Sequence, residues 1–241
     1  MLLGARQFFQ KSAAGWQNPY VTSGLVAMWD GIWNVGGGQE HDNSSKIWWD
    51  CVGGKPIILM SSKSVFGNLG VVQSAATAAT EQIVGGALGD DSSYGWRFAE
   101  YVITLDSVTT NVPYVLAIGR RGLWLNISGQ NIGVTHQNDE SWHSATAFPV
   151  GSTFSVSADY NSAGTSERGS AVWFNAASIS HTGGYDGWNN PVYSPYAIGA
   201  FYNVNYTFVG TYHAIRLYDR ALTQSEIDAN HALDVQRFGI S

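Results

Sequence analysis

Residues 208–227 read FVGTYHAIRLYDRALTQSEI, and this stretch decides the fold. In its first half, Ile215 and Leu217 alternate with Arg216 and Tyr218. Apolar residues at every second position are typical of a β-strand that buries one face. The stretch therefore predicts a half-buried strand, with Ile215 and Leu217 toward the core and the other two residues toward solvent.

The second half of the stretch predicts a helix directly after that strand. TQSE at residues 223–226 fits a capping box, in which Thr223 accepts a hydrogen bond from the Glu226 amide and the Glu226 carboxylate reaches back. The helix is expected to run to about Arg237, where Gly239 can take the left-handed closing conformation. A narrow apolar stripe follows it, made of Ile227, Leu233 and Phe238.

Short runs of β-branched and aromatic residues recur along the rest of the chain between Gly, Asn and Ser clusters. The clearest candidates are residues 25–29, 46–49, 57–60, 96–105, 114–119, 123–127, 154–160, 171–175, 196–200 and 207–218. In residues 154–160, FSVSADY, the apolar residues share one face and leave the other wet. The pattern predicts an all-β fold, an antiparallel two-sheet jelly-roll sandwich over residues 22–241 with a short C-terminal helix.

The same residues resemble a known family. Residues 208–227 are similar to the closing segment of laminin-G-like, concanavalin-A-like jelly rolls, G-x-x-x-x-(I/V)-R-(I/L)-Y-(N/D)-R-A-L-(S/T)-x-x-E-I. Residues 24–29, GLVAMW, resemble the family's opening strand, and residues 48–54, WWDCVGG, its W-x-D-x-x-G-G turn. At residues 171–175, AVWFN, the family has a Y-x-N-G hairpin, but Ala176 replaces the glycine. The resemblance implies the fold, which hosts lectins, hydrolases and adhesion modules alike.

Composition excludes several classes of function. Only 12% of the 241 residues are charged, and 12 Lys and Arg against 18 Asp and Glu give a formal charge of −6. No basic surface is available for nucleic acid. Cys51 is the single cysteine, so the chain can form neither an intrachain disulfide nor a cysteine-ligated zinc site. The sequence has no run of about 18 apolar residues, so no membrane insertion is expected.

The acidic residues predict that the protein is not an enzyme. Glycosidases on this scaffold resemble one another in an E-x-D-x-x-E strand, and retaining chemistry needs two carboxyl groups about 5 to 5.5 Å apart. None of the six Glu residues lies in such a pattern, and no His lies in a G-x-S-x-G or H-E-x-x-H context. A glycan-active hydrolase or lyase stays open as the alternative.

Aromatic residues beside short polar ones predict carbohydrate binding, because sugar rings stack on aromatic rings while their hydroxyls bond to Asn, Asp and Gln. Residues 33–43, 136–143 and 185–190 have this composition. The candidates are Tyr185, Asp186, Trp188, Asn189, Trp142, His143 and Trp33. The alternative is that the loop tryptophans pack over a sandwich end. No cofactor is predicted, although Asp186 with Asn189 or Asn190 could bind Ca²⁺ instead of forming a solvated turn.

The N-terminal residues suggest where the protein works. Residues 1–14 lack the continuous apolar run of a secretory signal, so we expect synthesis in a host cytoplasm and release by lysis. This predicts a non-catalytic bacteriophage or prophage virion protein, in a tail, fibre or capsid, that contacts glycans. A purely structural subunit without ligand is a second alternative. Residues 1–21, an apolar N-terminal extension, would anchor the domain to other virion subunits or fold back over its own sandwich. A homo-oligomer is also compatible with the sequence.

Overall fold

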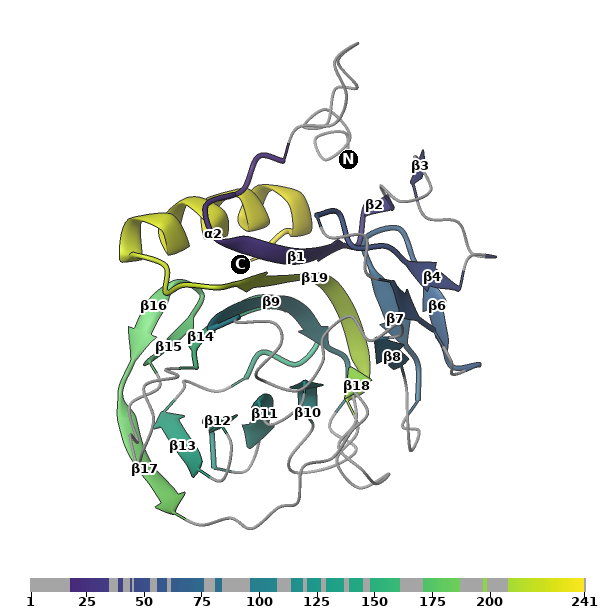
Figure 1. The fold of residues 1–241 in the computed structure, drawn as a ribbon. Helices are drawn as coiled ribbons and strands as arrows, with labels where there is room; N and C mark the ends of the chain where they lie inside the picture. The colour runs from purple at the N-terminus through teal and green to yellow at the C-terminus, as the bar shows by residue number, and fades with distance from the viewer. Residues whose placement is uncertain are drawn as a thin grey trace.

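In the computed structural model, antiparallel strands make up most of the described residues, and a helix near the C-terminus follows them (Figure 1). The structure describes residues 18–34, 39–40, 44, 46–52, 56–59, 62–75, 81–83, 96–107, 114–118, 121–126, 129–136, 139–144, 148–160, 171–186, 197–198 and 208–240. The predicted two-sheet jelly-roll sandwich with a C-terminal helix is confirmed. Among the described residues, no helix is long and apolar enough to cross a bilayer.

The strands divide between two large sheets and one small one. The first sheet contains β1 (Leu25–Asp30), β6 (Ser64–Phe66), β7 (Val71–Gln73), β9 (Phe98–Leu105), β14 (Thr153–Asp159), β15 (Ala171–Phe174), β16 (Ala177–Ile179) and β19 (Gly210–Tyr218). The second contains β4 (Ile47–Trp48), β5 (Ile57–Ile58), β8 (Glu81–Ile83), β10 (Tyr114–Ile118), β11 (Arg121–Asn126), β12 (Asn131–His136), β13 (Asp139–Ser144), β17 (His181–Asp186) and β18 (Ala197–Ile198). The small sheet pairs β2 (Trp33–Asn34) with β3 (Gln39–Glu40), and the helix is α2 (Gln224–Phe238).

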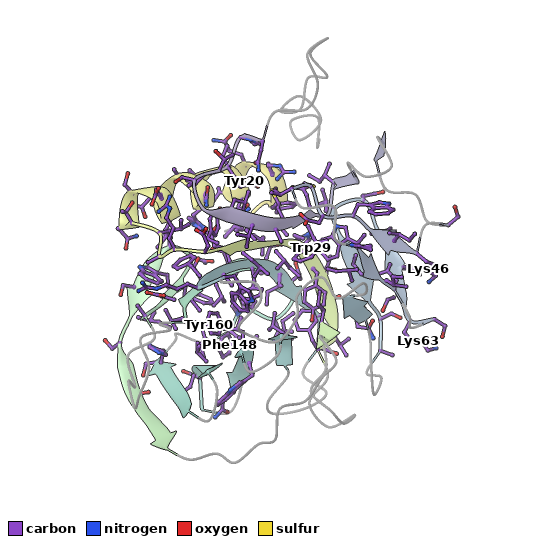
Figure 2. The ribbon with its side chains drawn as sticks, in the orientation of Figure 1. Tyr20, Trp29, Lys46, Lys63, Phe148 and Tyr160 are labelled. Atoms are coloured by element: carbon purple, nitrogen blue, oxygen red, sulfur yellow. The ribbon has the colours of Figure 1, made fainter. Side chains whose placement is uncertain are left out.

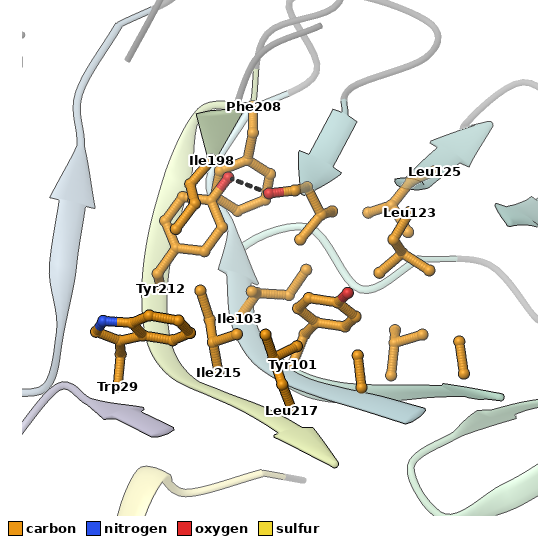
Figure 3. Close-up of a cluster of buried hydrophobic side chains, with 14 of the residues drawn as sticks. Trp29, Tyr101, Ile103, Leu123, Leu125, Ile198, Phe208, Tyr212, Ile215 and Leu217 are labelled. Atoms are coloured by element: carbon orange, nitrogen blue, oxygen red, sulfur yellow. Dashed lines mark hydrogen bonds between the residues drawn. The ribbon is translucent and has the colours of Figure 1, made fainter. Parts of the chain in front are cut away.

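The strand order places the predicted closing strand at the centre of the first sheet. That sheet runs β16-β15-β14-β9-β19-β7-β6, with β1 also paired to β19. The second sheet runs β17-β13-β12-β11-β10-β18-β8-β5-β4. The main apolar core lies between the two sheets and includes Tyr101, Ile215 and Leu217 from one and Leu123 and Leu125 from the other (Figure 3).

Tyrosine hydroxyls in this core are hydrogen-bonded rather than left bare. Tyr212 in β19 donates to the backbone oxygen of Val115 in β10 over 3.1 Å, which ties the two sheets together (Figure 3). The hydroxyls of Tyr101 and Tyr160 lie 3.2 Å apart. Such pairing removes the cost of burying a polar group.

The predicted solvent face of β14 and β19 is wrong. Arg216 and Tyr218 are 1% and 0% exposed, and Ser155 and Ser157 are also buried. Helix α2 lies across this face of the first sheet (Figure 1). Ile227 of the helix belongs to the same buried cluster as Tyr218. These strands are therefore buried on both sides.

A buried ion-pair network joins the helix to the sheet. The Arg216 guanidinium donates to Glu100 of β9 over 2.8 Å and to both oxygens of Asp234 of α2 over 2.9 and 2.5 Å. Asn230, one helical turn before Asp234, donates to Glu100 over 2.8 Å. Burial raises the pKa of Glu100, while Arg216 opposes that rise. The buried side of the helix is thus largely polar, not the apolar stripe alone.

Residues just before β1 are fastened to the same network. Tyr20 is buried, donates its hydroxyl to Asp234 over 2.7 Å and accepts from Arg237 over 2.5 Å. Its ring lies 4.1 Å from the Arg216 guanidinium carbon. In Figure 2 it lies at the helix, away from the core between the sheets. Residues 18–21 of the predicted N-terminal extension therefore pack on the sandwich, and residues 1–17 lie outside the described part.

The helix ends follow the sequence prediction. Thr223 and Glu226 form both hydrogen bonds of the capping box, and Gly239 closes the helix in the left-handed conformation at φ 70°. Arg220 adds a two-pronged bond to Glu226 over 2.6 and 2.9 Å. These bonds, Arg220 first and the Thr223 backbone next, lower the pKa of Glu226 to about 2.

The two remaining family-like turns are also structural. Asp50 of the W-x-D turn accepts backbone amides of Met28 and Val52, each over 2.8 Å, and Trp48 donates to the backbone oxygen of Asp30. In the β15–β16 hairpin, both turn residues have positive φ, 48° at Asn175 and 63° at Ala176. The turn therefore forms without the family's glycine.

Removing the central guanidinium should destabilise the fold strongly. We expect Arg216→Met to cost about 3 to 5 kcal/mol, because it leaves two buried carboxyl groups without their cation. Chemical denaturation followed by tryptophan fluorescence measures the change. Arg97→Met is the matched control: Arg97 and Asp159 also pair at 2.8 Å, but Arg97 is 36% exposed, so its loss should cost about 1 kcal/mol or less. Equal losses would contradict the assignment.

The Glu226 contribution should disappear in acid. Its pKa falls from 4.5 in an unfolded chain to about 2 in the fold, so its stabilising effect is complete above pH 4.5 and fades as the pH falls toward 2. The stability gap between the wild type and Glu226→Gln should shrink over that interval. Denaturation at several pH values tests it, and a gap that stays constant would show that the carboxylate is not held this way.

Candidate functional site

A row of alternating tryptophan and glycine crosses four neighbouring strands of the second sheet. Trp124 of β11 pairs with Gly133 of β12, Gly133 with Trp142 of β13, and Trp142 with Gly183 of β17. Residues directly opposite each other in antiparallel strands occupy the same face. The four positions therefore form one continuous row.

This row lies on the face turned away from the core, which we call the outer face. The flanking residues Leu123 and Leu125 in β11, and Ile132 and Val134 in β12, all belong to the core between the sheets. Successive residues of a strand alternate between faces. Trp124 and the rest of its row therefore occupy the opposite side.

Gly133 is required by the ring that covers it. A Cβ atom at this position would lie 1.8 Å from an indole carbon of Trp124 and 2.0 Å from a second. Trp124 is itself only 2% exposed, so its ring has little room to move aside. The indole thus lies against the bare backbone of β12.

Two more rows flank the tryptophan row on the outer face. On one side, the register joins Gly122, Thr135, Glu140 and Tyr185 across the same four strands. On the other side, it joins Asn126, Asn131 and Ser144. Aromatic, carboxylic acid, hydroxyl and amide residues therefore share one face, which is the composition that sugars require.

The structure brings together two of the three segments that the sequence singled out. Strands β13 and β17 pair directly, so Trp142 and Tyr185 occupy neighbouring rows of the outer face. Asp186 ends β17 opposite Asp139, at an alternate position. Trp33 lies in β2 of the small sheet, not in the second sheet. Trp188, Asn189 and Asn190 lie outside the described residues, so their predicted roles stay predictions.

His143 does not belong to the outer face. It pairs with the core residue Ile132 and is 1% exposed. As neighbours in one strand, Trp142 and His143 occupy opposite faces. Its imidazole is therefore placed for packing between the sheets, which corrects its assignment to a surface contact.

Sequence reasoning missed Trp124, Gly133 and Glu140 as parts of this face. Trp124 lies in the predicted strand 123–127, outside the three segments with sugar-binding composition, and Glu140 lies in the 136–143 segment without being one of the named candidates. The sequence carried one signal, the two-residue repeat of a β-strand. Leu123 and Leu125 belong to the core, so Trp124 between them occupies the opposite face. Gly133, between Ile132 and Val134, gives the same signal in the next strand.

The buried carboxylates among the described residues have structural partners. Glu100 and Asp234 bind Arg216, Asp30 binds Arg237 over 2.7 Å, and Asp50 accepts backbone amides. No group of three or more His, Cys, Asp or Glu residues in the described part of the chain could hold a metal ion. Calcium binding at Asp186 with Asn189 or Asn190 stays a prediction, because it involves residues outside that part.

Comparison with known proteins supports the fold. No protein-family model and no curated protein sequence matches the chain. Among solved structures, a Trypanosoma rangeli sialidase in complex with 2,3-difluoro-KDN is similar with a TM-score of 0.60 and 15% identity, over 95% of this chain and 36% of that one. A mutant of that sialidase displaying trans-sialidase activity gives a TM-score of 0.61 and 14% identity, over 93% of this chain and 35% of that one.

A shorter similarity involves a carbohydrate-binding domain. The CBM40 of a Ruminococcus gnavus sialidase bound to α2,6-sialyllactose matches with a TM-score of 0.42 and 13% identity, over 56% of this chain and 82% of that one. This chain spans only about a third of the sialidase chains that it resembles. At these identities the sialidase similarity shows a shared β-sandwich fold.

The contact between Trp124 and Gly133 can be tested by adding one methyl group. We expect Gly133→Ala to lower the free energy of unfolding by about 1 to 3 kcal/mol, as overpacking of a filled site does. Gly67→Ala is the control, because its Cβ would meet the Val72 side chain at 3.0 Å and otherwise only Gly70 at 3.6 Å. If the two variants lose equal stability, Trp124 does not lie against Gly133 as described.

Proposed function

We propose that this protein is a non-catalytic, glycan-contacting module of a bacteriophage or prophage virion appendage, and that the outer face is its binding surface. The observation that carries the proposal is the register that places Trp142 and Tyr185 in adjacent rows with Glu140. Two aromatic positions and one carboxylic acid position on a single face match the chemistry of a sugar ring, which has apolar C–H faces and polar edges.

The glycine positions support the proposal. Gly133 and Gly183 flank Trp142 on both neighbouring strands. The Trp124 indole covers Gly133, so only the Gly183 side is free of a side chain from the row. There the backbone of β17 can approach a ligand closely.

The alternative is a glycan-active hydrolase or lyase, which the similarity to sialidases keeps in view. The described buried carboxylates support the non-catalytic proposal, because Glu100, Asp234 and Asp30 are neutralised by arginines and so are poorly suited to donate or accept a proton. Incubation with sialylated and neutral polysaccharides distinguishes the two functions. Release of reducing ends or free sialic acid, abolished by one Asp or Glu substitution, would establish the enzyme.

The second part of the proposal is that the protein belongs to a bacteriophage or prophage virion. The single cysteine, Cys51, means that the chain needs no intrachain disulfide, and the buried network around Arg216 holds helix α2 instead. Such a fold suits assembly in a reducing cytoplasm. Mass spectrometry of purified phage particles tests the setting directly: the protein should co-purify with tail or capsid proteins, and its absence from particles would overturn it.

Glycan binding should depend on Trp142 and not on Trp33. We expect Trp142→Ala to weaken binding at least tenfold on a glycan array, because removing a stacked aromatic costs about 1.4 kcal/mol or more. Trp33→Ala makes the same change in the small sheet and should leave binding intact. Circular dichroism establishes that both variants fold. Loss of binding in Trp33→Ala alone would move the site to the 33–43 segment.

A further inference from the structure

His213 is buried and is bonded through both of its ring nitrogens. It lies at the β-bulge of β19, where the register with β9 shifts, and is 5% exposed. Its Nδ1 lies 2.8 Å from the backbone oxygen of Leu69 in the β6–β7 turn, and its Nε2 lies 2.8 Å from the hydroxyl oxygen of Thr104 in β9. A carbonyl oxygen can only accept, so Nδ1 carries a proton. Nε2 can then accept from Thr104, which is the arrangement of a neutral imidazole.

The C-terminal end of helix α2 covers this imidazole. Phe238 is the last residue of α2, and its ring centroid lies 5.3 Å from that of His213. His213 therefore lies where the end of the helix meets the first sheet. The apolar cluster that holds this end in place consists of Val102, Ala214, Phe238 and Ile240, with Ile32 and Leu69 packed against it.

The charged groups around this junction bond to other partners, whereas the described bonds of His213 are to uncharged groups. Burial lowers the pKa of His213, while the hydrogen bond to Leu69 and the Asp234 carboxylate oppose that change. Asp106, just after β9, is exposed, and residues 67–70 of the β6–β7 turn, GNLG, carry no charge. The paired groups are Glu100 of β9 and Asp234 of α2 with Arg216 of β19, Asp30 of β1 with Arg237 of α2, Asp159 of β14 with Arg97, and His231 of α2 with Ser155 of β14.

We propose that His213 is an acid-sensitive latch: when its imidazole takes up a proton, the end of the helix from Phe238 to Ile240 separates from the first sheet. A cation at this position would lie against an apolar cluster with two uncharged partners. Nε2 would also have to donate to Thr104, whose hydroxyl would turn toward the Thr153 hydroxyl at 2.9 Å. Separation of the helix end admits water, which stabilises the imidazolium. The latch is independent of the glycan surface.

The pH range of the latch follows from the direction of the pKa change. The pKa of His213 in the closed state is below its ordinary value of 6.5, so the latch is closed above that pH and weakens as the pH falls through it. Uptake of one proton on opening raises the opening equilibrium about tenfold per pH unit, until the pH reaches the pKa of the closed state. At the other end of the helix, the pKa of Glu226 is about 2, so its capping bonds persist through this range.

Amide hydrogen exchange, followed by NMR on the full chain, measures the two helix ends separately. The Gly239 amide bonds to the Val235 oxygen and the Ile227 amide to the Thr223 oxygen, each over 3.0 Å. After correction for the intrinsic exchange rate, protection of Gly239 should fall about tenfold for the first pH unit below about 6.5. Protection of Ile227 should stay constant. Absent protection of Gly239 at about pH 7.5, or protection that does not fall in acid, overturns the latch.

Two variants and one titration assign the effect to His213. His213→Gln removes the titrating group and should abolish the pH dependence at Gly239. His231→Gln is the matched control: His231 is half-buried in the same helix and bonds to the Ser155 hydroxyl over 3.0 Å, and its loss should leave the Gly239 response unchanged. The titration, carbon NMR of the wild-type imidazole, needs no variant to fold. A pKa of His213 at or above 6.5, or a response that follows His231 instead, overturns the proposal.

Discussion

The side chain of Arg216 constrains the rest of the first sheet. It is buried beneath helix α2, where an unpaired charge would be prohibitively costly, so Glu100 and Asp234 must lie within hydrogen-bond distance of it. Those residues come from a strand and a helix far apart in sequence. Their meeting fixes where the helix crosses the sheet. Tyr20, which precedes β1, donates to Asp234 and accepts from Arg237 near the end of helix α2, so these two segments join the same network.

The network selects one arrangement more than it adds stability. A buried ion pair recovers little more than the cost of removing its charges from water, and an apolar replacement of the same shape can be as stable. An apolar helix could slide over an apolar sheet, whereas Asn230 and Asp234 satisfy Glu100 and Arg216 in a single register. The helix position is therefore specified by hydrogen-bond geometry.

The sequence predicted the fold well because its signals are local. The capping box at Thr223, the closing Gly239 and the core positions Ile215 and Leu217 all depend on neighbours a few residues away. The outward face of β19 was predicted wrongly because alternation cannot tell a polar residue in water from one paired in the interior. A signal was present: Asn230, Asp234 and Arg237 recur at helical spacing and form one polar face.

The candidate site was predictable only in part, since it depends on strand order. Composition drew attention to Trp142 and Tyr185, but these residues are about forty positions apart in the sequence, and only the pairing of β13 with β17 brings their strands together. Composition also selected His143, because a local window does not separate the two faces of a strand. Trp124 and Gly133 carried the alternation, yet no local rule shows that they lie in register with Trp142.

The arrangement of the two sheets assigns them different roles. The outer side of the first sheet is occupied by helix α2, and residues 18–21, just before β1, bond to that helix through Tyr20 and Val21 (Figure 1). A ligand surface on that sheet would have to displace the Arg216 network, at the cost of uncovering buried charges. Among the described residues of the second sheet, the outer face shows the packing of Trp124 on Gly133 and no buried ion-pair network of this kind. Under the proposed function, the sheet that helix α2 covers would maintain the fold, and the other sheet would contact glycan.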